Sequence, residues 1–324
     1  MTTLRRAASV PGTRILGLGS AQPEQVVTND DLSKTMDTND TWIRERVGIV
    51  ERRFAGEKDT VVSMAVEAGA KAIADAGLSP SDLDTVIVAN CTTKSPIPNA
   101  AAQVAELLGI KAAGGFDLNA ACAGFCYGLG VASDLVLSGS SKRTLVIGSE
   151  KLTDIVDPTD RSTAIIFADA AGAAVVGPSD EPRIGPVAWG TAGDLVEMIG
   201  MTERQHIYQE GQSVFRWATT KIAPIALKAL DLAGLTPADV DVLVPHQANL
   251  RIVEAIAKKL RKEGAREDMV VADDIVYSGN TSSASIPMAM DHLRAAGKIH
   301  SGDVALLVGF GAGLSYAGQV VVCP

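Results

Sequence analysis

Three residues combine reactive side chains with informative positions in the sequence: Cys122, His246 and Asn280. Cys122 follows the apolar stretch FDL and precedes the almost uncharged segment 123–137, so we expect it between a strand and a buried helix. Unpaired N–H groups and the macrodipole at a helix N-terminus favour a thiolate there. Cys122 is therefore a candidate nucleophile, although free cysteines are also common as buried apolar residues.

His246 and Asn280 follow the same positional pattern, and two kinds of chemistry fit the set. His246 ends the apolar stretch VLVPHQ, and Asn280 lies in a glycine-bearing turn, YSGNTSS. In acyl transfer, a histidine activates the sulfur and an asparagine orients the histidine. In the other arrangement, both side chains donate hydrogen bonds to one carbonyl oxygen and stabilise an enolate. The sequence leaves these two arrangements open.

Two further features complete the set of candidate groups. The segment GFGAGLSY is a glycine-rich turn whose backbone N–H groups could face an oxyanion together with the Cys122 amide, or it is a plain turn. The remaining cysteines, which we expect in the core, are Cys91, Cys126 and Cys323.

An internal repeat shows which elements must position these residues. The segment KAIADAGLSPSDLD (71–84) returns as KALDLAGLTPADVD (228–241), and NAACAGF (119–125) corresponds to NTSSASI (280–286). Each copy passes from a helix into an apolar strand, which predicts an α/β architecture with mostly parallel sheets. We expect two homologous halves, residues 1–178 with the cysteine and residues 179–324 with His246 and Asn280.

The repeat also pairs positions between the halves. Cys122 is equivalent to Ser283, and His246 is equivalent to Ala89. Each reactive residue is thus an asymmetric departure from a duplicated template, at a loop that follows a strand.

Composition excludes several classes of protein. The chain has 324 residues, 47% of them hydrophobic, and a formal net charge of −9, which argues against nucleic acid as a partner. Four cysteines without close pairs indicate a reduced, cytoplasmic protein rather than a disulfide scaffold. The basic start MTTLRRAASVPGTR lacks the apolar stretch of a secretory signal. Four glycines interrupt the uncharged segment 304–324, so we expect two buried strands there and no membrane partner.

The motifs AACAGFCYGL, PHQANLRI, GNTSSASIP and GFGAGLSYAG together closely resemble the β-ketoacyl-acyl carrier protein synthase III family of the thiolase superfamily. The resemblance runs from RILGLGS to the last strand. It implies a duplicated, five-layered αβαβα fold with two mixed, mostly parallel sheets, assembled as a homodimer. It also implies an acyltransferase of fatty acid biosynthesis, which moves an acyl group from acyl-CoA to cysteine and condenses it with malonyl-acyl carrier protein.

The resemblance further implies roles for individual residues. Cys122 would carry the acyl group, the amides of Cys122 and Ala312 would form the oxyanion hole, and His246 with Asn280 would bind the malonyl thioester oxygen as its enolate develops. No cofactor and no metal ion is implied. The remaining positions carried over are Trp42, Arg46, Arg161, Gly211 and Asn249 for CoA binding, Arg251, Lys258 and Lys259 for carrier-protein docking, and Ile97 and Phe215 for the acyl pocket.

Two departures concern the acyl donor. The segment between Trp189 and Phe215 is shorter than in related sequences, and Ile97 stands where acetyl-preferring relatives often carry phenylalanine. A smaller residue there predicts a pocket that accepts longer or branched acyl groups.

Three alternatives to fatty acid initiation stay open. The first is selection of a polyketide starter unit, and the second is acyl transfer to oxygen or nitrogen without decarboxylation. The third is a non-catalytic partner subunit, which the presence of Cys122 disfavours.

Overall fold

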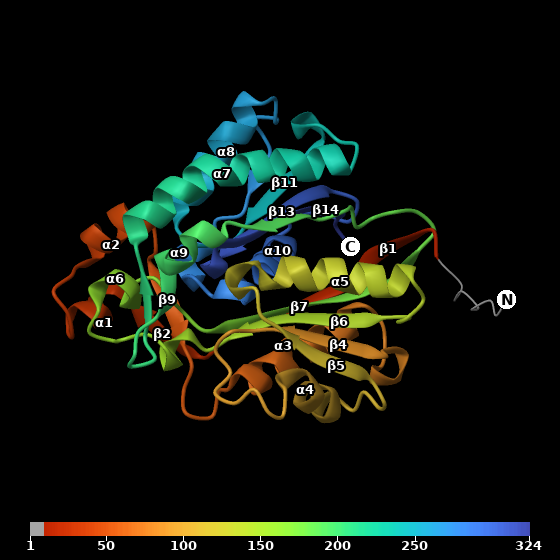
Figure 1. The fold of residues 1–324 in the computed structure, drawn as a ribbon, viewed down its shortest axis with the longest axis horizontal. Coiled ribbons are helices and arrows are strands. Elements are labelled where there is room, and N and C mark those ends of the chain that lie inside the picture. Colours follow the sequence, from red (N-terminus) through yellow and green to blue (C-terminus); the bar gives the residue numbers. More distant parts are fainter. Residues whose placement is uncertain (1–9) are drawn as a thin grey trace.

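Two five-stranded mixed sheets form the frame of the protein in the computed structural model, which describes residues 10–324 (Figure 1). The first has the order β1-β7-β6-β4-β5, with β1 (Gly12–Ala21), β4 (Thr85–Ala89), β5 (Gly114–Leu118), β6 (Thr144–Glu150) and β7 (Ala170–Ser179). The second has the order β12-β11-β13-β14-β8, with β8 (Ala188–Thr191), β11 (Val242–Pro245), β12 (Val270–Val271), β13 (Val304–Gly311) and β14 (Ser315–Val322). The first nine residues of the basic start, for which we expect no secretory signal, lie outside the described part.

Helices cover both sheets and separate them (Figure 1). The outer face of the first sheet carries α3 (Val61–Asp75) and α4 (Ala100–Leu108). Between the sheets lie α5 (Gly124–Leu137) and α10 (Ser285–Ala295). The outer face of the second sheet carries α7 (Gly211–Leu232) and α8 (Leu250–Lys262). The expected αβαβα order of five layers is thereby confirmed.

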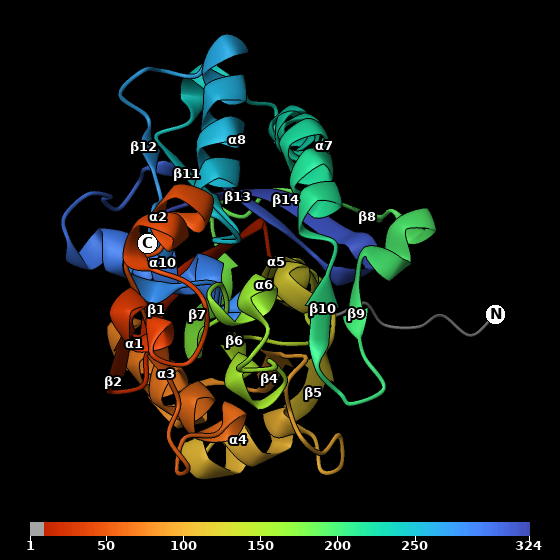
Figure 2. The same cartoon turned by 90° about the vertical axis from the view of Figure 1, so that its left-hand side faces the viewer.

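Short elements gather at one end of the layers, where Figure 2 shows α2, α6 and the β9–β10 hairpin in front of the two sheets. The β9–β10 hairpin contacts α6, and the Ile207 N–H donates to the carbonyl of Ile155 in the segment that leads from β6 to α6. The elements of this region are α1 (Asn29–Ser33), α2 (Asp40–Val47), α6 (Arg161–Ala164), α9 (Ile275–Ser278), β2 (Gln25–Thr28), β3 (Glu51–Phe54), β9 (Ile199–Met201) and β10 (Ile207–Gln209).

Half of the neighbouring strand pairs in each sheet are parallel, whereas we expected most of them to be parallel. In the first sheet β4 runs parallel to β5 and β6, while β7 runs antiparallel to β6 and β1. In the second, β11 runs parallel to β12 and β13, while β14 runs antiparallel to β13 and β8. The strands β6–β7 and β13–β14 are consecutive and return antiparallel, an arrangement that needs no crossover helix.

The central strands are apolar because both of their faces are buried. Ile87 on β4 packs into the layer between the sheets, whereas its neighbours Val86 and Val88 pack under α3 and α4. The uncharged C-terminal segment forms β13 and β14, as expected. No helix among residues 10–324 is both long and apolar enough to cross a membrane.

Both copies of the repeat build the same succession of elements. α3 leads through the 3-10 turn η1 (Pro80–Asp82) into β4, and α7 leads through η5 (Pro237–Asp239) into β11. Likewise η2 (Ala121–Ala123) precedes α5 and β6, and η6 (Ser282–Ala284) precedes α10 and β13. Both 3-10 turns open on a left-handed residue, at φ 46° for Ala121 and 52° for Ser282. The division between residues 178 and 179 stays a prediction.

Candidate active site

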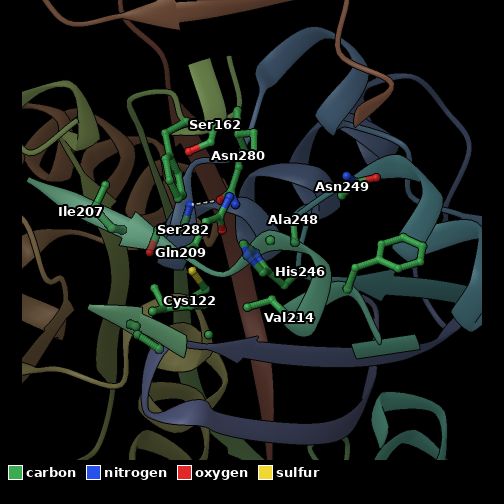
Figure 3. Close-up of a pocket in the computed structure, with 18 of the residues that line it drawn as sticks. Cys122, Ser162, Ile207, Gln209, Val214, His246, Ala248, Asn249, Asn280 and Ser282 are labelled. Carbon is green, nitrogen blue, oxygen red and sulfur yellow. Dashed lines mark hydrogen bonds between the residues drawn. The ribbon is translucent and has the colours of Figure 1, made fainter. Parts of the chain in front are cut away.

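Cys122, His246 and Asn280 line one cavity of about 760 Å³ (Figure 3). The cysteine comes from the junction η2–α5 in the first part of the chain, and the other two follow β11 and α9 in the second. Apolar side chains from the β9–β10 hairpin, including Ile199 and Ile207, line the same cavity. The structure therefore brings together the three residues that the sequence singled out.

The backbone around Cys122 approaches a glycine of the second sheet. Ala121 adopts φ 46°, and its N–H donates to Asn119 Oδ1 at 3.2 Å, which fixes the turn before α5. A Cβ atom on Gly311 would lie 2.7 Å from the Cys122 nitrogen and 2.9 Å from the Cys122 Cβ, inside van der Waals contact. Only a glycine at position 311 therefore allows the start of the β13–β14 turn to lie against the cysteine. Ala312 is the next residue in this turn.

The environment of Cys122 favours the thiol, which corrects the expected thiolate. Burial raises the pKa of Cys122 to about 12, and the nearby Glu150 carboxylate acts in the same direction, against the Ser282 hydroxyl that lowers it. The helix N-terminus is present as expected, but the loss of water around the sulfur disfavours the charged form more strongly. Cys122 rests as a neutral thiol.

His246 is held as a neutral imidazole. Its side chain is 2% exposed, and burial lowers its pKa to about 3. The ring packs edge-on against Phe310, with centroids 5.3 Å apart, and Nδ1 lies 2.8 Å from Ser285 Oγ. Ser285 Oγ accepts from the Gln247 N–H at 3.4 Å, so its own hydrogen is available to Nδ1. This network is compatible with a ring proton on Nε2, the tautomer in which Nδ1 accepts from the Ser285 hydroxyl.

Asn280 is fixed through both its backbone and its side chain. Its N–H donates to the Ile166 carbonyl, and its carbonyl accepts from the Ala168 N–H, each at 2.9 Å. The side-chain Oδ1 accepts from the Ser282 N–H at 2.9 Å, the bond drawn in Figure 3. Since the acceptor of the carboxamide is engaged, its Nδ2 group is the part left to donate to a ligand.

These bonds distinguish the two arrangements that the sequence left open. His246 Nδ1 bonds Ser285, and Asn280 Oδ1 bonds the Ser282 N–H, so the asparagine does not orient the histidine. The other nitrogens, His246 Nε2 and Asn280 Nδ2, take no part in these bonds, and both side chains line the cavity that contains the sulfur. Such a pair can stabilise negative charge on one oxygen beside a bound thioester.

Most residues expected to contact CoA lie along the same cavity. Trp42, Arg46, Gly211 and Asn249 line it, and Asn249 Nδ2 donates to the Arg46 carbonyl at 3.1 Å. Arg161 does not line the cavity itself but covers the Trp42 ring, with its guanidinium carbon 4.6 Å from the centroid. It is held there by a 2.7 Å bond to the Asp37 carbonyl.

The predicted docking and acyl-pocket residues fall in different places. Arg251 and Phe215 line the cavity, with the guanidinium 5.1 Å from the ring centroid. Lys258 and Lys259 lie two turns farther along α8, outside the cavity lining. Ile97 is 83% exposed and does not line the cavity of the single chain, so its place in the acyl pocket stays a prediction. Its loop precedes α4, and the side chain faces outward.

The sequence reasoning missed several residues that shape the site. Cys91 lines the cavity with Cys122 instead of lying in the core. Ser282 and Ser285 hold Asn280 and His246, and their place in GNTSSAS beside Asn280 was the available signal. Glu150 is fully buried, and a charged residue ending the apolar stretch TLVIGS was its signal. Within residues 10–324, no group of three or more His, Cys, Asp or Glu could hold a metal ion.

Comparison with known proteins gives a consistent result. Residues 116–193 match the family model "3-Oxoacyl-[acyl-carrier-protein (ACP)] synthase III", and residues 230–323 match that family's C-terminal model. The beta-ketoacyl-[acyl-carrier-protein] synthase III of Streptomyces glaucescens is 46% identical, over 100% of both chains.

Two solved structures extend the likeness to the fold. The priming beta-ketosynthase from the R1128 polyketide biosynthetic pathway superposes with a TM-score of 0.96 at 42% identity, covering 100% of this chain and 99% of that one. The 3-oxoacyl-[acyl-carrier-protein] synthase III of Aquifex aeolicus superposes with a TM-score of 0.91 at 38% identity, covering 96% and 100%.

Proposed function

Because the chain belongs to the 3-oxoacyl-[acyl-carrier-protein] synthase III family and is a condensing enzyme of the acyltransferase type, we propose how its cavity performs the reaction. An acyl group passes from acyl-CoA to Cys122 and is then joined to malonyl-acyl carrier protein with loss of CO₂. The observation that carries this proposal is the pair of donors, His246 and Asn280, beside the sulfur in one cavity.

In the first half-reaction, Cys122 Sγ attacks the thioester carbonyl of acyl-CoA. The C–S bond to CoA breaks, and the thiol proton of Cys122 leaves with the CoA thiolate, so the exchange is balanced. The developing oxyanion receives the N–H groups of Cys122 and Ala312. The close approach of the β13–β14 turn, permitted by Gly311, supports this placement.

In the second half-reaction, malonyl-acyl carrier protein loses CO₂, and the electrons of the broken C–C bond form an enolate. His246 Nε2–H and Asn280 Nδ2–H donate to the enolate oxygen. The enolate carbon attacks the Cys122 thioester, the C–S bond breaks, and the released thiolate takes up one proton from water. A neutral imidazole suits this role, since a pKa lowered to about 3 keeps His246 uncharged at neutral pH.

For CoA we propose that its adenine stacks between Trp42 and Arg161. Two van der Waals contacts of about 3.5–4.0 Å need roughly 7 Å between the two groups. The guanidinium carbon lies 4.6 Å from the ring centroid, so Arg161 must turn away to admit the base. Arg46, Gly211 and Asn249 would contact the rest of CoA, and Phe215 the acyl end of the cavity.

The proposed partner is an acidic carrier protein that docks on α8 next to Arg251, Lys258 and Lys259. In a chain with net charge −9, this local basic helix supports docking by charge complementarity. We further propose a cytoplasmic homodimer that needs no cofactor. The exposed apolar side chains Ile97 and Phe116, 83% and 37% exposed, support burial against a second copy.

One experiment tests both half-reactions. Acyl-CoA is added and the intact mass is measured, and we expect a single acyl adduct that is lost in Cys122→Ala. Malonyl-acyl carrier protein should then clear the adduct with release of CO₂. Transfer of the acyl group to an alcohol or amine without CO₂ would instead support simple acyl transfer.

A polyketide priming role is the second candidate, supported by the TM-score of 0.96 to a priming beta-ketosynthase. The carrier protein separates the two roles. If kcat/KM with the fatty acid carrier protein is comparable to that with a polyketide carrier protein, fatty acid initiation is supported. A strong preference for the polyketide carrier protein supports starter-unit selection.

A further inference from the structure

Glu150 is a buried carboxylate that the proposed mechanism does not use. It ends β6, its side chain is 0% exposed, and among residues 10–324 it forms no ion pair. Burying a charge without a cation is costly unless hydrogen bonds replace the lost water. The surroundings of Glu150 place five donors within hydrogen-bond distance, in two sets, although Ser283 shares its single hydroxyl hydrogen with the Ala89 carbonyl.

The donors come from both halves of the chain. Oε2 accepts from the Cys91 N–H at 3.0 Å and from Thr92 Oγ1 at 2.7 Å. Oε1 accepts from Ser283 Oγ at 2.9 Å, Ser282 Oγ at 3.1 Å and the Cys91 thiol at 3.4 Å. The carboxylate thus joins the end of β4 to η6, the turn that follows Asn280.

The duplication shows that this carboxylate departs from the shared template. Gly148 on β6 and Gly309 on β13 are 161 residues apart, as are Cys122 and Ser283, and the same spacing pairs Glu150 with Gly311. Gly311 lies against Cys122, and Glu150 accepts a bond from Ser283, the equivalent of Cys122. One half leaves this position without a side chain, whereas the other fills it with a carboxylate.

The bond to Ser282 connects Glu150 with Asn280. Ser282 adopts φ 52°, a left-handed conformation that is strained for a residue with a side chain. In this conformation its N–H donates to Asn280 Oδ1 at 2.9 Å, while its hydroxyl donates to Glu150. The carboxylate therefore holds the turn whose N–H orients the Asn280 carboxamide.

We propose that Glu150 is a positioning residue for the condensation step, which acts through Ser282 to keep the Asn280 donor directed at the enolate oxygen. This inference rests on the proposed function. It predicts that loss of the carboxylate impairs decarboxylation and condensation while Cys122 still accepts the acyl group.

The test uses Glu150→Gln, which keeps the size but replaces one acceptor oxygen with a donor, so one set of donors loses its partner. Acylation is followed by intact mass, and condensation by CO₂ release from the acylated enzyme with malonyl-acyl carrier protein. We expect the condensation rate to fall by about 10- to 100-fold, with the adduct still formed. Glu150→Asp, which retains the carboxylate, should recover part of the rate.

A double-mutant cycle separates positioning from a general structural effect. In the Asn280→Ala background, Glu150→Gln should cause little further loss of condensation, because its effect passes through Asn280. Additive losses would overturn the inference, as would equal losses of acylation and condensation. If Glu150→Gln folds poorly, Glu150→Asp takes its place in the same cycle, and its smaller loss of condensation should likewise disappear in the Asn280→Ala background.

The control variant is Asp84→Asn at the far end of the same sheet. Asp84 also accepts bonds from backbone N–H groups, those of Lys142 at 2.8 Å and Arg143 at 3.3 Å, but lies outside the cavity lining. We expect it to lower the melting temperature without changing the ratio of the two half-reactions. If the wild-type enzyme releases no CO₂, the proposed function fails; if it does and the cycle is additive, only the role of Glu150 fails.

Discussion

At the scale of single residues, the site depends on groups kept neutral by burial. The pKa of Cys122 is raised to about 12 and that of His246 is lowered to about 3, in both cases chiefly by loss of water. The opposite signs have one cause, since burial disfavours the anion of a thiol and the cation of an imidazole alike. At neutral pH the cavity thus holds a thiol and a neutral donor, and charge develops only during the reaction.

The thiol pKa leads to a prediction about pH. Below a pKa of about 12 the thiolate fraction of Cys122 rises about tenfold per pH unit, so its alkylation by iodoacetamide should keep accelerating from pH 7 to 9. The rate is measured by intact mass, with Cys122→Ala reporting alkylation of the other cysteines. A plateau near pH 7 would show that the helix N-terminus outweighs burial.

At the scale of elements, the site requires a close approach between a 3-10 turn and a strand end. Gly311→Ala would place a methyl group 2.7 Å from the Cys122 nitrogen, so the β13–β14 turn must shift away from the sulfur. We expect acylation of Cys122 to slow by at least about 10-fold. The rate is measured from the fraction of acylated enzyme, by intact mass, in samples quenched at successive times. Gly193→Ala is the matched control because a methyl group there meets no atom within 4 Å.

The basic face of α8 supports a second prediction at this scale. Reversing two charges in Lys258→Glu/Lys259→Glu should raise KM for malonyl-acyl carrier protein by about 10-fold and leave KM for acyl-CoA unchanged. The wild-type KM for the carrier should also rise with salt, and the variant's should rise less. The control, Lys111→Glu/Lys142→Glu, changes two exposed lysines outside α8. Equal effects of both pairs would point to net charge rather than docking.

The sequence was most informative where local chemistry and periodicity determine an element. The repeats located the strand ends, and thereby placed Cys122, His246 and Asn280 around one cavity. It was least informative where contacts between distant segments decide the outcome. The antiparallel return of β7, the outward orientation of Ile97 and the position of Cys91 all depend on such contacts. The bond between Ser285 and His246 likewise spans 39 residues, and the bond between Ser282 and Glu150 spans 132.

At the scale of the whole molecule, the first sheet ends on an edge strand, β5. Among residues 10–324, β5 pairs with β4 alone, so no strand covers its outer edge, where the Asn99 side chain donates to the Gly115 carbonyl at 3.1 Å and Phe116 is 37% exposed. An edge strand of this kind is a template for pairing with another chain. A second copy related by a twofold axis could pair β5 with β5 and cover the exposed phenylalanine, since a twofold interface joins the same patch on both subunits.

This geometry makes Phe116 the residue that tests the proposed homodimer. Phe116→Lys would place two positive charges near each other across the axis, so we expect it to convert a wild-type dimer into a monomer with an unchanged far-UV CD spectrum. Mass is measured by light scattering after size exclusion. Tyr277→Lys alters another exposed side chain, 63% exposed and on α9, and should leave the dimer intact. If the wild-type chain is monomeric, or if the lysine at position 116 leaves the dimer intact, β5 is not the interface, and the exposed edge must be protected in another way.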